Sequence, residues 1–498
     1  MAEAVDILFI NPGDRKQIYQ ALGDEFSAIE PPVFAGLFAT YARQKGASVA
    51  IYDAPAHGVS AAEVARVATE EYDPKLIVIV VYGFQPSAST QNMTAAGSVA
   101  TEIKKLAPTS KVMMTGTHPA ALPARTMDEE AIDFLCDLEG PVTIHKTLEA
   151  VKAGVENFGD IPSLWWRDED GHIHQPRAAE PLLSNLDEEI PGIAWDLMPM
   201  DKYRAHNWHS FDHIHDRAPY AAIHTSLGCP YKCSFCCINA PFGKSSYRCW
   251  SPDSVIQEID FLVENYGIKN IKFVDEMFVL NKHHVMGICE KLQSRDYDVN
   301  IWAYARVDTV QDEFLDALKG AGINWLCLGI ESASDHVRDG ALKKYGNDDI
   351  KDVVRRIQGA GIYIIGNYIF GLPDDNVARM QATLDLALDL NCEFANFYSA
   401  MAYPGSKLYD LAVAKGIALP ETWKDFSQHG TNALPLANDH CSAAEILEFR
   451  DNAFDQYFHH QPYLDMVNAK FGQDVVDHLD RMVKIPLRRK LLEDRQAA

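Results

Sequence analysis

Two long stretches of the chain alternate short apolar runs with segments of helical periodicity, and a proline-rich segment separates them. Each apolar run has the length of a strand, and several end in turn-forming residues such as Asn-Pro-Gly at 11–13. Regular alternation of strand and helix predicts parallel sheets covered by helices. Strands are expected at residues 6–11, 47–52, 76–81, 111–115 and 131–135 in the first stretch, and at 222–226, 270–274, 300–305, 325–330, 363–369 and 394–400 in the second.

This pattern predicts an α/β protein with four parts. Residues 1–154 match a doubly wound, Rossmann-like parallel sheet. Residues 155–220 are rich in proline and are expected to form a linker with a small hairpin at 164–175. Six further units over 221–403 have the count of a partial (β/α)6 barrel, because a closed barrel needs eight. Residues 404–498 are expected to be mostly helical.

Composition limits the partners. The chain has 45 Lys and Arg against 70 Asp and Glu, a net charge of −25, which argues against a nucleic-acid partner held by a basic surface. A basic stretch at 481–490 is expected to be a solvated helix end, with an anionic small molecule as the alternative partner. The longest strongly apolar run, Leu76–Val81, is far shorter than the roughly 20 residues of a membrane helix, and no signal peptide is evident. No membrane partner and a cytoplasmic location are therefore expected.

The most specific motif is a cysteine triplet. Cys229, Cys233 and Cys236 form C-x3-C-x2-C directly after a predicted strand. Three thiolates on one loop can bind three irons of a [4Fe–4S] cluster and leave the fourth iron open. Zinc is the competing interpretation, but it needs a fourth ligand from Cys237 or Cys249, and adjacent cysteines suit one tetrahedral ion poorly. Three unrelated buried thiols are the remaining alternative.

This triplet, with an aromatic residue before its last cysteine and a six-fold βα unit after it, resembles the radical S-adenosylmethionine (SAM) superfamily. The resemblance covers about residues 221–403. It implies that Cys229, Cys233 and Cys236 hold a cluster whose open iron binds SAM. One electron, from an external donor such as flavodoxin or ferredoxin, would then cleave SAM to a 5′-deoxyadenosyl radical.

The same resemblance implies SAM contacts at the strand ends. A carboxylate suits the SAM amino group, and a guanidinium suits its carboxylate. For Glu276 a helix cap remains the alternative, and for Arg306 a structural ion pair does. Tyr368 and Tyr403 are candidate catalytic or substrate-pocket residues, although barrel packing explains them equally well. The expected SAM contacts are Phe235 beside the adenine, Glu276 at the amino group, Arg306 at the carboxylate, Glu331 and Ser332 at the ribose, and Gly366 along the adenine.

A doubly wound domain before such a barrel resembles the cobalamin (vitamin B12)-binding class of this superfamily. Residues 30–32 (Glu-Pro-Pro) and the turns at the strand ends are similar to that class. The resemblance implies a corrin ring lying across the strand ends and facing the cluster. The expected cobalamin contacts are Asn11, Pro12, Tyr82, Gly83, Gly116, Thr117, His118, Glu139 and Gly140.

One departure concerns the cobalt ligand. Corrinoid mutases carry D-x-H-x-x-G after the first strand, whereas residues 11–16 here contain no histidine, so cobalamin is expected to bind base-off without a histidine ligand. A nicotinamide site is disfavoured because no G-x-G-x-x-G follows the first strand. A methylthiotransferase would need three further cysteines, but residues 1–228 contain only Cys136. A sheet that binds nothing remains the plain alternative.

The resemblance therefore implies a cobalamin-dependent radical SAM methyltransferase. It would methylate an unactivated carbon of a small-molecule or natural-product intermediate through methylcobalamin and a 5′-deoxyadenosyl radical. The alternative is a cyclase, oxidase or rearrangement enzyme that uses the same cofactors without net methyl transfer. A non-catalytic corrinoid or iron–sulfur sensor is a third hypothesis. The cofactors supply the reactive chemistry in either enzyme, and the protein supplies orientation and water exclusion.

Overall fold

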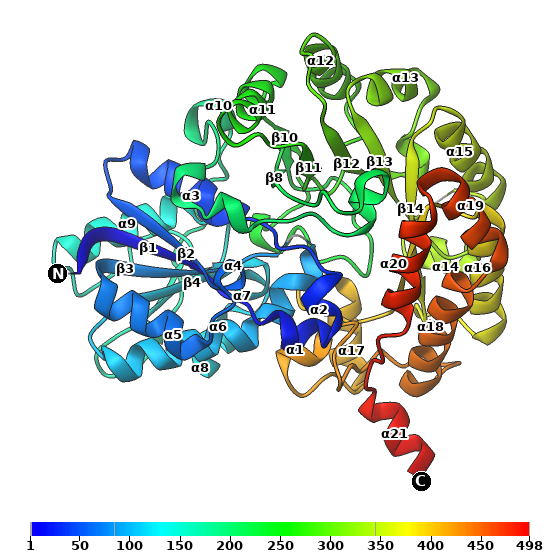
Figure 1. Ribbon diagram of the computed structural model, residues 1–498. Coiled ribbons are helices and arrows are strands. Elements are labelled where there is room, and N and C mark those ends of the chain that lie inside the picture. The colour runs from blue at the N-terminus through cyan, green and yellow to red at the C-terminus, as the bar shows by residue number, and fades with distance from the viewer. Residues whose placement is uncertain (1, 84, 344, 498) are drawn as a thin grey trace.

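The computed structural model describes residues 2–83, 85–343 and 345–497. In this part of the chain the strands form a seven-stranded N-terminal sheet, a six-stranded barrel sheet and a two-stranded ribbon. Figure 1 shows the N-terminal sheet in blue on the left and the barrel sheet in green to yellow on the right. The strands of the N-terminal sheet run toward the barrel, so their carboxyl ends face it (Figure 1).

The N-terminal sheet has the strand order β2-β1-β3-β4-β5-β6-β7. Its first five strands are parallel, and the order reverses between β1 and β3, which makes a topological switch point at their carboxyl ends. The hairpin that we predicted within the linker pairs antiparallel with β5 and extends this sheet. The strands are β1 (Glu3–Asn11), β2 (Val49–Asp53), β3 (Tyr72–Val81), β4 (Val112–Gly116), β5 (Phe134–Cys136), β6 (Leu164–Arg167) and β7 (Ile173–His174).

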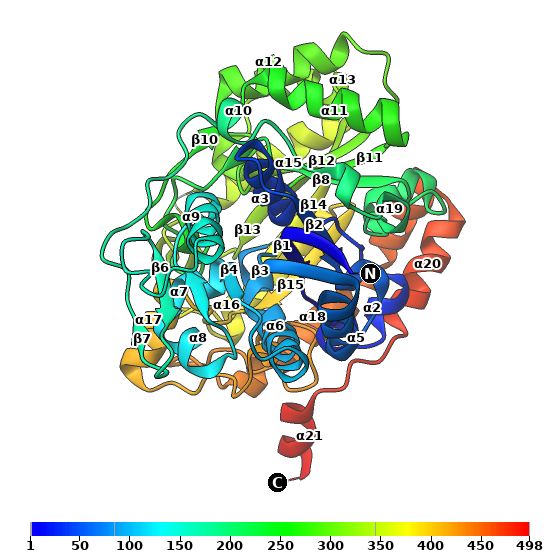
Figure 2. The same ribbon diagram turned by 90° about the vertical axis from the view of Figure 1, so that its left-hand side faces the viewer.

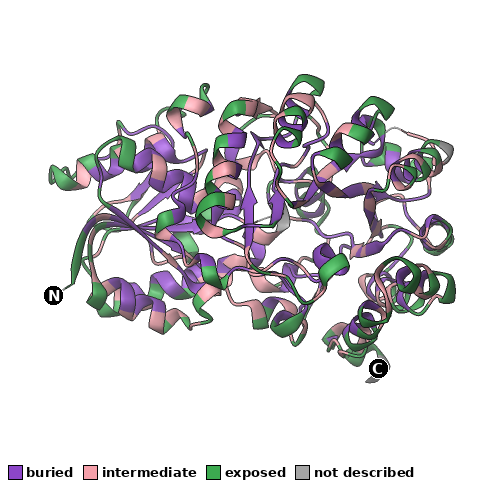
Figure 3. Cartoon of the chain, turned by 45° about the horizontal axis from the view of Figure 1, so that its top comes forward, coloured by how far each residue is buried: buried purple, intermediate pink, exposed green. Residues whose placement is uncertain are grey.

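Helices cover both faces of this sheet. Along β1, Ile7 and Phe9 pack on one face and Leu8 and Ile10 on the other, as the alternation of a strand requires. Figure 3 shows the buried strands between two layers of helices whose outer faces are exposed. The helices are α1 (Arg15–Tyr19), α2 (Leu22–Glu25), α3 (Val33–Gln44), α4 (Ala54–His57), α5 (Ala61–Arg66), α6 (Pro86–Leu106), α7 (Thr117–Ala121), α8 (Pro123–Glu129) and α9 (Pro141–Lys152).

The barrel sheet is parallel throughout, in the order β15-β14-β13-β12-β11-β8. Figure 2, in which the N-terminal part faces the viewer, places these strands behind the N-terminal sheet. All six predicted strands are present. They are β8 (Tyr220–Ile223), β11 (Asn270–Phe273), β12 (Asn300–Arg306), β13 (Ile323–Glu331), β14 (Tyr363–Phe370) and β15 (Phe394–Ser399), with helices α10 (Leu186–Glu189), α11 (Pro252–Tyr266), α12 (Lys282–Gln293), α13 (Asp312–Gly320), α14 (Asp335–Gly340), α15 (Asn347–Gly359) and α16 (Val377–Leu390).

An aromatic floor closes the amino-terminal end of the barrel. The Trp208 ring lies 5.0 Å from that of Trp302, 5.7 Å from that of Trp325 and 6.1 Å from that of Phe394. Trp208 belongs to the segment that connects the two sheets, so the predicted linker also contributes to the core of the barrel. The open end of the barrel is therefore the carboxyl end of its strands.

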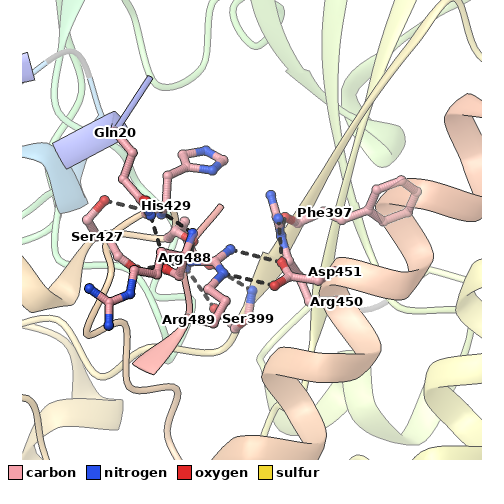
Figure 4. Close-up of polar contacts among 11 residues, drawn as sticks. Gln20, Phe397, Ser399, Ser427, His429, Arg450, Asp451, Arg488 and Arg489 are labelled. Atoms are coloured by element: carbon pink, nitrogen blue, oxygen red, sulfur yellow. Dashed lines mark hydrogen bonds and ion pairs between the residues drawn. The ribbon is translucent and has the colours of Figure 1, made fainter. Parts of the chain in front are cut away.

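The C-terminal region is helical, as expected, and contacts both the N-terminal part and the barrel. Arg489 pairs with Asp451 at 2.8 and 2.9 Å, and the side-chain amide of Gln20, directly after α1, donates to the carbonyl of His429 at 2.7 Å (Figure 4). Arg489 is buried, so part of the basic stretch that we predicted as a solvated end is structural. No helix among the described residues has the length and apolar character to span a bilayer. The helices are α17 (Lys407–Lys415), α18 (Ala443–Phe458), α19 (Gln461–Phe471), α20 (Gln473–Val483) and α21 (Lys490–Ala497).

A buried ion pair joins the N-terminal segment to the barrel. Lys272 on β11 lies 3.0 Å from Glu30, and their side chains are 2% and 8% exposed. The Tyr220 hydroxyl on β8 donates to the same carboxylate at 3.0 Å. Glu30 thus bridges two adjacent barrel strands and fixes how the N-terminal segment enters the barrel.

This pair predicts a strong and non-additive effect on stability. Replacing Lys272 by Met leaves the Glu30 carboxylate buried without its cation, which is expected to lower the free energy of unfolding by about 3–5 kcal/mol. Adding Glu30→Gln removes the stranded charge and is expected to recover part of that loss. Urea unfolding of both variants measures the two effects.

The exposed pair Lys282–Glu313 serves as the control, since its side chains are 62% and 46% exposed. Lys282→Met should change the free energy of unfolding by less than about 1 kcal/mol. A Lys272→Met loss as small as that of the control would contradict a structural role for the buried pair.

Candidate functional site

The three cysteines lie on the loop that the ribbon β9 (Ser226–Leu227) and β10 (Arg248–Cys249) closes. Cys229 is buried, and Cys233 and Cys236 are half-buried. Burial raises the pKa of Cys229 to about 12, and the neighbouring Glu276 carboxylate and Cys233 thiol add to this shift. Neighbouring thiolates repel one another, so they need a cationic partner to stay together. The irons of a cluster supply that positive charge. The donor set therefore fits a cluster.

Among the described residues, no group of three or more His, Cys, Asp or Glu side chains converges on a position for one metal ion. A cubane does not require such convergence, because each of its cysteine ligands binds a different iron. Arg306 Nη1 lies 3.7 Å from Cys233 Sγ and adds positive charge beside the loop.

Glu276 lies at the end of β11, beside this loop. Its Oε2 atom is buried and has no hydrogen-bond partner among the described residues, and burial raises the pKa of the carboxyl to about 8. A buried carboxylate oxygen without a donor suits an incoming ammonium group. The position that we predicted for the SAM amino group therefore fits that ligand.

Arg306 and Glu331 each have a protein partner. Arg306 donates to both oxygens of Asp308, at 2.8 and 3.0 Å, and its guanidinium lies 3.9 Å from the Tyr231 ring centroid. Glu331 forms an ion pair with Lys343 at 2.5 Å. The sequence analysis did not single out Lys343. Arg306 thus forms the structural ion pair that was the alternative, and contact of either residue with SAM stays a prediction.

Phe235 and Ser332 also lie near the barrel mouth. The Lys343 ammonium is 6.0 Å from the centroid of the Phe235 ring, which packs against Leu372 and Ala400. Ser332 is fully buried, with its hydroxyl 3.2 Å from that of Thr383. Phe235 therefore stays a candidate for the adenine wall, whereas the hydroxyl of Ser332 already has a structural partner.

The structure contradicts the catalytic role predicted for Tyr368. The Tyr368 ring stacks on Phe397 at 5.4 Å, and Phe397 in turn packs against Tyr457 of α18. A Cβ on Gly366 would lie 2.8 Å from the Tyr368 hydroxyl oxygen. Both residues therefore face the helices outside the barrel. Tyr368 is therefore a packing residue and cannot be catalytic, whereas contact of the Gly366 backbone with adenine stays a prediction.

Tyr403 lies in the connection to the C-terminal region. Its hydroxyl donates to the carbonyl of Phe426 at 3.3 Å and lies 3.4 Å from the Gln428 side-chain nitrogen. It holds that connection against the barrel edge, and a catalytic role stays a prediction.

Half-buried side chains lie on the inner face of the barrel strands between the floor and the mouth. Side chains on the inner face of β12, β14 and β15 are half-buried, while their neighbours in sequence are buried beneath helices. The Asn367 amide donates to Cys327 Sγ at 2.8 Å and accepts from the Asn396 amide at 3.0 Å. The half-buried inner side chains are Tyr304, Asn367, Ile369, Asn396 and Tyr398.

A pocket lies at the switch point of the N-terminal sheet and is shared with the barrel. Tyr82 stacks on Phe34 with ring centroids 3.8 Å apart, and Phe34 meets the ring of His224 edge-on at 5.2 Å. The Asn11 amide donates to Asp53 at 2.8 Å. The pocket is lined by Asn11, Pro32, Val33, Phe34, Ala35, Val80, Tyr82, Gly83, His224 and Val274. The mainly apolar character of this lining, with few polar groups, suits contact with one face or edge of a larger, mainly apolar ring system such as a corrin.

Three of the predicted cobalamin contacts, Asn11, Tyr82 and Gly83, line this pocket, and buried Pro12 follows Asn11 directly. Gly116, Thr117, His118, Glu139 and Gly140 are not among its lining residues. The reasons are local and differ from residue to residue.

His118 is 1% exposed, with Nδ1 3.1 Å from the Thr90 hydroxyl and its ring edge-on to Trp423. Burial lowers its pKa to about 3. The predicted loop contact is therefore a packing residue, as is the adjacent buried Thr117.

Glu139 forms an ion pair with Arg248 at 2.8 Å and thereby ties the N-terminal sheet to the cysteine-loop ribbon. Gly116 is required because a Cβ would lie 2.0 Å from the carbonyl oxygen of Val81. Gly140 has φ +113°, a conformation that favours glycine, and its N–H donates to Glu180 at 2.5 Å. These three residues have structural roles.

Comparison with known proteins follows the same division of the chain. Residues 19–146 match the B12 binding domain, and residues 223–387 match the radical SAM superfamily. The chain is 30% identical over 426 residues to the uncharacterized methyltransferase PH0819 of Pyrococcus horikoshii, covering 85% of this chain and 87% of that protein. It is 24% identical to the anaerobic magnesium-protoporphyrin IX monomethyl ester cyclase of Rubrivivax gelatinosus, over 81% of this chain and 69% of that protein.

A solved structure shares the fold. The radical SAM methyltransferase TsrM from Kitasatospora setae, with cobalamin and a [4Fe–4S] cluster bound, aligns with a TM-score of 0.66 and 17% identity. The alignment covers 92% of this chain and 89% of that one. Both the N-terminal sheet and the barrel therefore occur together in a protein of known structure.

The cysteine loop predicts a selective loss of iron. Replacing Cys229, Cys233 or Cys236 by Ser should abolish the iron content that anaerobic reconstitution gives, about four irons per chain, because each thiolate holds one iron. Cys237→Ala is the matched control, since this adjacent buried cysteine lies outside the triplet. The Cys237→Ala variant should keep its iron. Iron and sulfide analysis after desalting measures both, and loss of iron in the control alone would contradict the assignment.

Proposed function

Because the chain belongs to the cobalamin-dependent radical SAM enzymes, we propose that it methylates an unactivated carbon of a small-molecule or natural-product intermediate. The observation that carries this proposal is the pocket shared by the two sheets. His224 in its wall lies five residues before the first cluster cysteine, and Val274 lies two residues before Glu276. A group held in this pocket and a group held by the cysteine loop would therefore share one chamber.

When bound, the reduced cluster and SAM supply an organic radical and cobalamin carries the methyl group, with the electron drawn from an external donor of the flavodoxin or ferredoxin type. The residues of the chain bind and orient these groups. The Glu276 carboxylate would accept hydrogen bonds from the SAM ammonium group. Phe235, with the Lys343–Glu331 pair, would form the wall beside the nucleoside.

The half-buried inner face of the barrel strands is proposed to contact the substrate. The amides of Asn367 and Asn396 are oriented by their mutual hydrogen bond, and the half-buried Tyr304 and Tyr398 add phenolic hydroxyls on the same inner face. The aromatic floor excludes water from the closed end, which protects a radical intermediate. A small molecule with several polar groups suits this lining better than an aliphatic one.

The products of SAM distinguish methylation from the alternative. A methyltransferase is expected to form S-adenosylhomocysteine together with 5′-deoxyadenosine, in roughly equal amounts, because one SAM donates the methyl group and another the radical. Anaerobic incubation with a strong reductant and chromatography measure both products. Formation of 5′-deoxyadenosine without S-adenosylhomocysteine would favour the cyclase, oxidase or rearrangement chemistry, and no cleavage at all would favour a sensor.

Glu276 gives a prediction for SAM binding. Glu276→Gln keeps the size of the side chain but removes the charge that would face the ammonium group. The dissociation constant of SAM should rise about 10-fold or more, since hydrogen bonds to charged groups contribute about 1.5–3 kcal/mol. Equilibrium dialysis of the reconstituted protein measures the constant.

Glu258→Gln is the matched control, because this buried carboxylate on α11 accepts hydrogen bonds from the Trp195 indole at 2.7 Å and the Ile193 N–H at 3.0 Å, and its substitution should leave the dissociation constant of SAM unchanged. The assignment requires the iron content of Glu276→Gln to match that of the unmodified chain. An unchanged dissociation constant in a variant that keeps its iron would contradict the role of Glu276.

A further inference from the structure

His224 places a buried imidazole in the wall of the pocket shared by the two sheets. It is 7% exposed and directly follows β8. Neither Nδ1 nor Nε2 has a hydrogen-bond partner among the described residues, although the backbone of Ser226 lies close to the ring. Burial lowers the pKa of His224 to about 3, so the ring is neutral and offers one N–H donor and one lone pair. Such a group is costly to bury unless something satisfies it.

The surroundings of His224 identify where a partner can come from. His224 lines the pocket at the switch point, where its neighbours Phe34, Val80 and Val274 are apolar. The Phe34 ring meets it edge-on and supplies no hydrogen-bonding group. The pocket is therefore the direction from which donors and acceptors can reach the imidazole.

We propose that His224 binds cobalamin from the barrel side, through hydrogen bonds with amide side chains at the corrin edge. A primary amide offers both an acceptor oxygen and N–H donors, which matches the donor and the lone pair of a neutral imidazole. The apolar lining would contact the ring system, and Asn11 would stand as the polar residue of the opposite wall. The inference depends on cobalamin binding in this pocket and not on which reaction follows.

A pair of substitutions tests the hydrogen bonds. His224→Phe retains an aromatic ring beside Phe34 but removes both nitrogens, and should weaken hydroxocobalamin binding about 10-fold or more. His224→Gln offers one donor and one acceptor again and should stay within about threefold of the unmodified chain. The dissociation constant is measured by equilibrium dialysis of the full chain after cluster reconstitution, with iron content as the check on folding.

His209→Phe is the matched control. His209 is also buried and neutral, with its pKa lowered to about 3, but it packs against Tyr220 at the opposite end of β8 and its Nε2 lies 3.0 Å from the carbonyl oxygen of Asn300. Its substitution should leave hydroxocobalamin binding unchanged. Equal weakening by both phenylalanine variants, or no weakening by His224→Phe, would overturn the inference.

A measurement on the unmodified chain is independent of the variants. Cob(II)inamide keeps the four corrin nitrogens but lacks the nucleotide base, so an axial nitrogen that gives a resolved splitting in its electron paramagnetic resonance spectrum must come from the protein. Hydrogen bonding at the corrin edge predicts no nitrogen splitting. A triplet that disappears in His224→Phe would overturn the proposed mode, because it would make His224 a cobalt ligand. A chain that binds no corrinoid at all would refute the pocket itself, and would leave the radical SAM assignment standing.

Discussion

The Glu30–Lys272 ion pair fixes the arrangement on which the rest of the structure depends. Glu30 comes from the segment between β1 and α3, and its carboxylate meets Lys272 of β11 and the Tyr220 hydroxyl of β8. Two residues later the same segment enters the wall of the switch-point pocket at Pro32. One buried pair therefore sets the position of α3 against the barrel and brings the carboxyl ends of two parallel sheets to face each other. Removing either partner would strand a charge in the interface, which makes this docking specific.

Much of the fold could be predicted because hydrophobic periodicity is a local property. Every predicted strand of the two parallel sheets is present, including the short β5. The hairpin β6–β7 was predicted as a hairpin, but its pairing with β5 depends on tertiary contacts that no local pattern encodes. In the site, the cysteine triplet could be recognised because all its ligands lie on one loop. The catalytic assignment of Tyr368 was wrong because neighbouring residues on a strand face opposite sides, so a motif placed at a strand end does not say which side chain enters the barrel.

Several polar residues at the strand ends form ion pairs with other side chains of the protein. Glu139 pairs with Arg248, Glu331 with Lys343 and Arg306 with Asp308. Only the last of these pairs is close in sequence. The sequence could therefore suggest a functional role for each residue, but it could not show that the residue already forms an ion pair with a distant side chain. Arg248 also joins the N-terminal sheet to the ribbon that closes the cysteine loop. These ion pairs hold the loop and the strand ends in place, which is what a precisely positioned reaction chamber requires.

Glu276 and His224 differ from those residues because no ion pair in the described part of the chain involves them, and each keeps a buried side-chain atom without a hydrogen-bond partner there. His224 directly follows β8, and Glu276 lies three residues beyond the adjacent strand β11. Glu276 lies beside the cysteine loop, and His224 lies in the pocket shared with the N-terminal sheet. Burial disfavours the charged form of each, which raises the pKa of Glu276 and lowers that of His224. A neutral imidazole suits the amides of a corrin, whereas a carboxyl held near neutrality becomes an anion once an ammonium group binds beside it. The two residues therefore have chemistry that suits two different ligands.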